Sequence, residues 1–183
     1  AELPGMDPEL QPIFRNLLSL DPPDHTRLRR LVQPSFTARA VRPLRPRIKA
    51  IAERLLDAAD AAATARGERQ PNRTMDLLAA YAVPLPIAVI FELLGVPDSD
   101  RDRVYAWTHD LLNVGTVADA EQSKNALRPF IAYTRALVAA KRADPAGDLL
   151  SSFLAVEEDG DRLDEDEMLS MVFVCVEPWV SVG

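Results

Sequence analysis

The segment LDPPDHTRLRRLV, residues 20–32, concentrates positive charge in a chain that is acidic overall. It holds one histidine and three arginines, whereas the 183 residues together carry a formal net charge of −7. Proline is well tolerated in the first turn of a helix, because the N–H that it lacks has no partner there. We therefore predict a helix that opens at DPPD, with Asp21 as its cap, and that ends near Gln33, before Pro34.

The two faces of this predicted helix follow from a wheel of about 100° per residue. Its buried stripe is formed by Leu28, Leu31 and Val32. His25 and Arg29 are four residues apart and border the stripe, where a cation needs a partner, whereas Arg27 and Arg30 are predicted to point to solvent. Two interpretations of the first pair stay open: ion pairs with aspartates at the start of the helix, or a site for the carboxylates of a buried ligand.

Apolar residues recur with helical spacing over most of the remaining chain. The further helices are expected over residues 47–66, 77–94, 100–114, 127–138, 149–154 and from 165 onward. Ser99 is the expected cap of the helix that follows it. Pro84 and Pro86 predict a break, Pro129 is expected to set or kink the start of its helix, and Pro178 should stop the last one.

The last helix has a clear start signal. Asp164 and Glu167 stand three residues apart, in a variant of the capping box. At most one short strand, at residues 74–76, is expected beside the helices. The predicted fold class is therefore all-α, with six or seven helices.

Composition excludes several functions. The sequence pI of about 4.9 argues against nucleic-acid binding. A single cysteine, Cys175, excludes an internal disulfide framework. The two histidines, His25 and His109, are too few and too far apart for a zinc site. AELPGMDPEL at the N-terminus is not a signal peptide and the apolar run MLSMVFVCV is too short to span a bilayer, so we expect a soluble cytoplasmic protein without membrane partners.

Several segments, in a fixed order, resemble one protein family. DPPDHTRLRRLVQPSFTARAVRPLRPRI resembles a region of bacterial cytochrome P450 proteins, the haem-thiolate monooxygenases. The family pattern there is D-P-P, then H-T-x-x-R, then a short F-T. YAVPLPIAVIFELLGVPDSDRDRVYAW and DLLSSFLAVEEDGDRLDEDEMLSMVF match later family helices. The resemblance covers about residues 16–173 and implies a partial cytochrome P450 fold.

The resemblance also implies a cofactor and partners. In the family, the residues that match His25 and Arg29 bind the haem propionates, and the exposed Arg27 and Arg30 would lie where a ferredoxin docks. A plain solvated face is an equally good interpretation of Arg27 and Arg30. The family function is haem-dependent monooxygenation of a small organic substrate, with electrons from a ferredoxin and its NAD(P)H-linked reductase.

The chain departs from the family pattern at three places. The A-G-x-E-T-like segment for oxygen activation is absent, and CVEPWVSVG stands in its neighbourhood. No E-x-x-R and no F-x-x-G-x-x-x-C-x-G loop occur, so the axial thiolate has no match. Cys175 lies among valines on the last helix and is interpreted as a core residue.

We therefore expect residues 1–183 to form a single helical fragment of a cytochrome P450 domain, with an irregular lead-in at 1–20 and a divergent tail at 174–183. No catalytic residue and no metal ligand are assigned. The fragment alone is expected not to turn over substrate, and the alternative is a non-enzymatic helical ligand-binding or interaction protein. We also expect poor stability, with the apolar stripes at residues 28–32 and 168–176 partly exposed.

Overall fold

The computed structural model describes residues 10–69, 71–112, 119–157 and 160–180. Most of these residues are helical, and among them only Asp161 takes part in an isolated β-bridge. Residues 74–76 are not a strand. The prediction of an all-α chain with at most one short strand is confirmed.

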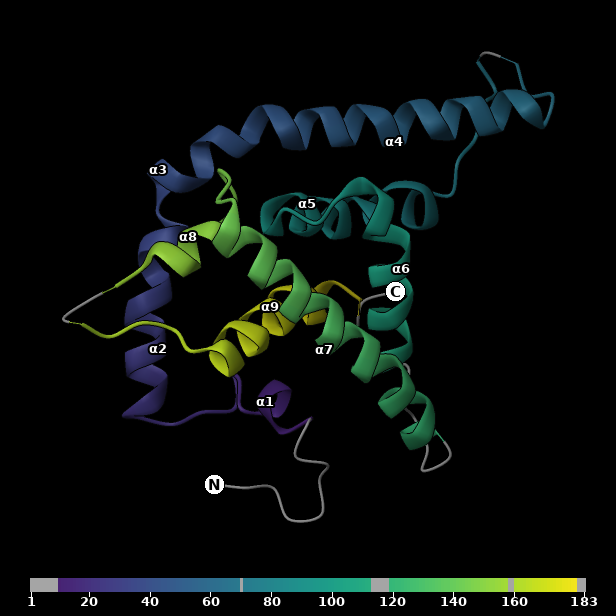
Figure 1. Ribbon diagram of the computed structural model, residues 1–183. Helices are drawn as coiled ribbons and strands as arrows, with labels where there is room; N and C mark the ends of the chain where they lie inside the picture. The colour runs from purple at the N-terminus through teal and green to yellow at the C-terminus, as the bar shows by residue number, and fades with distance from the viewer. Residues whose placement is uncertain (1–9, 70, 113–118, 158–159, 181–183) are drawn as a thin grey trace.

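The described helices follow one another without an intervening sheet (Figure 1). In chain order they are α1 (Gln11–Phe14), α2 (Asp24–Val32), η1 (Gln33–Phe36), α3 (Ala38–Val41), η2 (Arg42–Leu44), α4 (Arg45–Ala65), η3 (Leu78–Ala82), α5 (Pro84–Leu94), α6 (Asp98–Leu112), α7 (Asp119–Ala143), α8 (Leu149–Ala155) and α9 (Glu165–Val180).

Two predicted caps are wrong. Helix α2 begins only at Asp24, with Pro23 at the capping position, so the Asp21 side chain does not cap it. The backbone carbonyl of Asp21 instead accepts the N–H of His25 at 3.1 Å. Helix α6 begins at Asp98, which places Ser99 inside its first turn.

Two prolines do not end or start helices as predicted. Pro129 lies inside α7, which begins ten residues before it, at Asp119. Helix α9 continues past Pro178 to Val180. A proline removes one backbone hydrogen bond, but its fixed φ is compatible with a helix.

The predicted break in the 77–94 segment is confirmed. A π-turn, η3, precedes α5, and the N–H of Val83 bonds to the carbonyl of Leu78 at 3.0 Å. Helix α5 then starts at Pro84. It ends at Gly95, whose φ of 68° lies in the left-handed region that glycine tolerates best.

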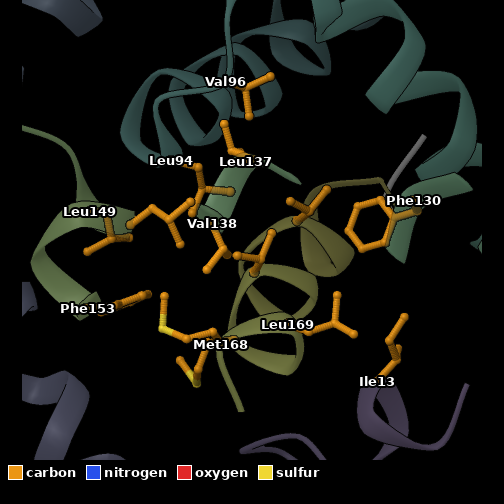
Figure 2. Packing of buried hydrophobic residues seen from close by; sticks show 14 of the residues in the cluster. Ile13, Leu94, Val96, Phe130, Leu137, Val138, Leu149, Phe153, Met168 and Leu169 are labelled. Atoms are coloured by element: carbon orange, nitrogen blue, oxygen red, sulfur yellow. The ribbon is translucent and has the colours of Figure 1, made fainter. Parts of the chain in front are cut away.

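Helix α9 lies in the middle of the structure. It packs against α1, α5, α6 and α7, while the long helix α4 lies along one edge and rests on α5 and η3 (Figure 1). Side chains from the surrounding helices, α8 included, gather around α9, with Leu94, Val138 and Phe153 on the side of Met168 and Ile13 on the side of Leu169 (Figure 2). Each of these six residues is at most 3% exposed.

The prediction that two apolar stripes would be partly exposed is mostly wrong. Leu28, Leu31 and Val32 on α2 are at most 4% exposed, and five apolar residues of α9 are buried as well. The helices cover these stripes with one another. The large exposed apolar side chains lie elsewhere, at Leu18, Phe36, Val41, Leu56, Met75, Leu77 and Leu78.

Over the described residues, no single helix has the length and apolar character needed to cross a membrane. One helix pair, Leu78–Leu94 with Asp98–Thr108, meets the requirement together, but it is bent by 119°.

Candidate functional site: the cationic helix α2

Helix α2 places His25 and Arg29 on one flank of its buried stripe. His25 is half-buried and Arg29 is exposed. Neither side chain has an ion pair or hydrogen bond with another residue in the described part of the chain. His25 and Arg29 therefore form no ion pairs with the aspartates at the start of the helix in the part of the chain that the structure describes. Two neighbouring cationic side chains remain available for the carboxylates of a ligand.

The cavities of the described region are lined by other residues. A polar cavity of about 350 Å³ lies between α1 and the starts of α2 and α9, and its wall includes Asp24, Asp164 and Glu167. A smaller, more apolar cavity of about 180 Å³ lies beside Phe36 and Leu149. His25 and Arg29 therefore lie on the outer side of α2 and line neither cavity.

Arg27 is the main departure from the wheel prediction. Its side chain is one-third exposed and reaches out of α2 to the segment before α9. Nε and Nη2 donate to the two carboxylate oxygens of Asp161 at 2.7 and 2.8 Å. Nη1 donates to Oε1 of Glu167 at 2.5 Å, and Nη2 also donates to Oε2 of Glu167 at 3.3 Å and to the carbonyl of Arg162 at 3.2 Å.

These contacts shift the pKa values of Arg27 and Asp161. The hydrogen bonds that Arg27 donates to Asp161 and then to Glu167 raise the pKa of Arg27 above its ordinary value. The hydrogen bond from Arg27 lowers the pKa of Asp161. Both groups are therefore held in their charged forms at neutral pH.

The wheel could have indicated that Arg27 is not a freely solvated residue. It precedes Leu31 by four residues, so the two lie about 40° apart and Arg27 borders the buried stripe on the side opposite to Arg29. Its acidic partners, however, are 134 and 140 residues further along the chain. No local sequence pattern could identify Asp161 and Glu167 as those partners.

Arg30 is exposed, as predicted. It contributes an attractive charge interaction that helps to lower the pKa of Asp161. Arg27 and Arg30 therefore act on the same carboxylate, to which Arg27 is also hydrogen-bonded. His109 lies on α6, and nothing is described of its side chain.

Cys175 lies on α9 as a partly buried, free cysteine. Removal from water raises the pKa of its thiol to about 12. The thiol is therefore protonated at neutral pH in the metal-free chain. Over the described residues, no group of three or more His, Cys, Asp and Glu side chains is arranged to hold a metal ion.

The folded chain is similar to part of solved bacterial cytochrome P450 structures. Its structure matches the cytochrome P450 PksS of Bacillus subtilis with a TM-score of 0.83 and 35% identity, over 95% of this chain and 42% of that one. The myxobacterial cytochrome P450 CYP267B1 matches with a TM-score of 0.76 and 40% identity, over 95% of this chain and 41% of that one. The fold is therefore a portion of the cytochrome P450 fold.

Sequence comparison agrees with the structural match. Cytochrome P450 107B1 of Saccharopolyspora erythraea is 44% identical over 172 residues, which are 93% of this chain and 38% of that relative. The mycinamicin IV hydroxylase/epoxidase of Micromonospora griseorubida is 41% identical over 168 residues, 92% of this chain and 39% of that relative. No protein-family model matches the chain.

The homologues of the chain are bacterial cytochrome P450 proteins, and the chain corresponds to a part of their length. It spans somewhat less than two-fifths of the length of the curated relatives that it matches.

Proposed function

We propose that this chain forms a helical, haem-binding part of a cytochrome P450 monooxygenase. One observation carries the proposal: His25 and Arg29 stand side by side on α2 without an acidic partner among the described residues. Two cationic donors four residues apart on a helix suit a ligand that bears two carboxylates. The similarity of the chain to cytochrome P450 proteins supports haem as that ligand.

The described residues fit the carboxylates of a haem, but they do not provide the thiolate ligand of its iron. His25 and Arg29 would hold the carboxylates through charge-assisted hydrogen bonds, each contributing about 1.5–3 kcal/mol. Cys175 packs against the apolar core from α9 and does not match the axial-thiolate loop, so it does not fit the role of a thiolate ligand. When bound through a thiolate, haem supplies the dioxygen activation of a monooxygenase.

The substrate of the reaction would be a small organic molecule. Two relatives carry names that state such substrates, a mycinamicin IV hydroxylase/epoxidase and a vitamin D(3) 25-hydroxylase. Those names describe the relatives. For this chain, we propose only the class of small organic substrates.

The electron donors would be a ferredoxin and its NAD(P)H-linked reductase. Arg30 would contribute to ferredoxin docking through its exposed charge. Arg27 would contribute less than its charge implies, because Asp161 and Glu167 offset it.

We further propose that these 183 residues alone do not turn over substrate, because the sequence has no match to the axial-thiolate loop. The test is the absorbance of the purified chain with added haem, reduced under carbon monoxide. The expected result is a haem spectrum without the thiolate-ligated type of carbon monoxide band.

Each other outcome of this test is informative. A thiolate-type band would contradict the proposal that the chain alone is inactive, and it would mean that Cys175 reaches the iron. No haem binding at all would favour the alternative, a non-enzymatic ligand-binding or interaction protein on the same scaffold.

A further inference from the structure

The contacts of Arg27 join two elements that are distant in sequence. The loop before α9 passes next to α2 (Figure 1). The guanidinium of Arg27 makes five hydrogen bonds with this loop and the first turn of α9. Four of the five go to carboxylate oxygens of Asp161 and Glu167. Such a forked, charge-assisted arrangement fixes direction as well as distance.

Glu167 also belongs to the start of α9. Its Oε2 atom accepts the backbone N–H of Asp164 at 3.0 Å, and Asp164 Oδ1 accepts the backbone N–H of Glu167 at 2.8 Å. The carboxylate that receives Arg27 is therefore already held by the capping box. Arg27 thus binds to a fixed point on α9 and not to a free surface side chain.

The direction of Arg27 on α2 determines what its contacts control. Arg27 and Arg29 are two residues apart, so their side chains leave the helix about 160° from each other. Arg27 is held on one flank, while His25 and Arg29 project from the other. A helix with its side chains has a radius of about 5–6 Å, so a roll of about 20° moves a side-chain end by about 2 Å. A shift of that size breaks a hydrogen bond.

We propose that Arg27 is a positioning residue, which fixes the rotation of α2 about its axis so that His25 and Arg29 meet the carboxylates of haem. This inference rests on the proposed function of His25 and Arg29. It assigns Arg27 a role within the chain, through α9, in place of a role in partner docking.

The test compares two porphyrins that differ only at the carboxylates. Iron protoporphyrin IX and its dimethyl ester are titrated by absorbance into the 183-residue chain and its Arg27→Ala, Arg27→Lys and Asp161→Asn variants. Arg29→Ala shows how the two affinities change when a side chain proposed to donate to the porphyrin carboxylates is removed. Arg42→Ala is the matched control, because Arg42 is exposed and has no described partner. Circular dichroism verifies that each variant retains its helices.

The measured quantity is the ratio of the dissociation constant of the ester to that of the diacid. In Arg27→Ala this ratio should fall about tenfold or more from the wild-type value, toward that of Arg29→Ala, because a charge-assisted hydrogen bond is lost. In Arg27→Lys the ratio should also fall to near the Arg29→Ala value, since an ammonium group cannot form the forked pair of hydrogen bonds that a guanidinium forms. The ratio should also fall in Asp161→Asn, and it should stay at the wild-type value in Arg42→Ala. A loss of overall stability alone would weaken both porphyrins equally and leave the ratio unchanged.

Two outcomes overturn different statements. If the wild-type ratio exceeds that of Arg29→Ala but Arg27→Ala and Asp161→Asn retain it, Arg27 has no positioning role and the proposed function stands. If the wild type and Arg29→Ala have the same ratio, or the wild type binds neither porphyrin, the proposed function fails and the positioning role fails with it.

Discussion

At the scale of single residues, Gly95 is the most constrained backbone position described. Its φ is 68°, and an added Cβ atom would lie 2.3 Å from Asp148 Oδ2 and 2.5 Å from Lys141 Nζ. Gly67 has a similar φ of 81° but nothing within 4 Å of the corresponding Cβ. Substituting each glycine by alanine therefore separates two effects on stability: the positive φ, which both positions share, and the steric clash of the added Cβ, which occurs only at Gly95.

We expect Gly67→Ala to lower the free energy of unfolding by about 1 kcal/mol, which is the cost of a left-handed conformation for alanine. Gly95→Ala should cost at least about 1 kcal/mol more, because it also disturbs a buried ion pair. Urea denaturation of both variants measures the difference. Equal losses for the two variants would show that the contact with Asp148 can relax freely.

The ion pair of Lys141 with Asp148 links α7 to α8, with Nζ and Oδ2 2.5 Å apart and Asp148 buried. Burial alone would raise the pKa of Asp148, but the hydrogen bonds from Lys141 and Ser151 outweigh it and lower the pKa below the ordinary 3.8. This pair therefore stabilises the fold above pH 3.8, and the contribution is lost as pH falls through the lower folded pKa.

Lys141→Met should reverse the direction of this pH dependence. Without its partner, buried Asp148 should have a raised pKa, so the variant should gain stability relative to wild type as pH falls from 7 toward 4. At pH 7 the loss should be about 3 kcal/mol. Lys49→Met is the control, because Lys49 is 75% exposed and pairs only with Glu53. The unfolding midpoint in urea, followed from pH 7 to pH 4, measures both; parallel profiles for the wild type and Lys141→Met would contradict the assignment.

Individual site residues could be predicted from sequence where their roles are local. The proximity of His25 and Arg29 follows from helical spacing, and the cap made by Asp164 with Glu167 was predicted correctly. The partners of Arg27 depend on tertiary packing, and the wheel alone could not supply them.

At the scale of elements, the helices with regular apolar spacing were predicted and the irregular connections were not. Helix α4 ends at Ala65, before Gly67, as expected. The short helices η1, α3 and η2 between Gln33 and Leu44 were missed, because each spans at most four residues, which is too short to show a helical period of apolar residues. Helix boundaries near prolines were the least predictable, since packing decides whether a helix continues through them.

The start of α9 provides a test at this scale. Asp164→Ala should lower the free energy of unfolding by about 1 kcal/mol, because the N–H of Glu167 loses its side-chain acceptor. Asp164→Ser should restore most of that stability, since serine is also a good cap. Thermal unfolding followed by circular dichroism compares the two. A serine variant that is as unstable as the alanine variant would argue against a capping role.

At the scale of the whole molecule, the chain exposes more surface than a compact protein of its mass. Its accessible surface is 11235 Å², whereas a compact monomer of 20.2 kDa exposes roughly 8,800 Å². Large apolar side chains such as Leu77 and Leu78 remain 57% and 68% exposed. This extra surface could not be predicted from the sequence, because it depends on how the helices are arranged.

We therefore expect low stability and a strong response to haem. A ligand present at a thousand times its Kd adds about 4 kcal/mol of stability, a large share of the 5–15 kcal/mol of an ordinary domain. Differential scanning calorimetry should show a broad transition at low temperature without haem, and a higher Tm with it. A sharp transition at high temperature that haem leaves unchanged would contradict this expectation.

The central claim is that α2 binds the carboxylates of haem through Arg29 and His25. The most direct measurement is the dissociation constant of iron protoporphyrin IX for the wild-type chain, for Arg29→Ala and for the exposed control Arg45→Ala. The account predicts binding by the wild type, weakening by about tenfold or more in Arg29→Ala from the loss of a charge-assisted hydrogen bond, and little change in Arg45→Ala. The same dissociation constant for all three chains would contradict it.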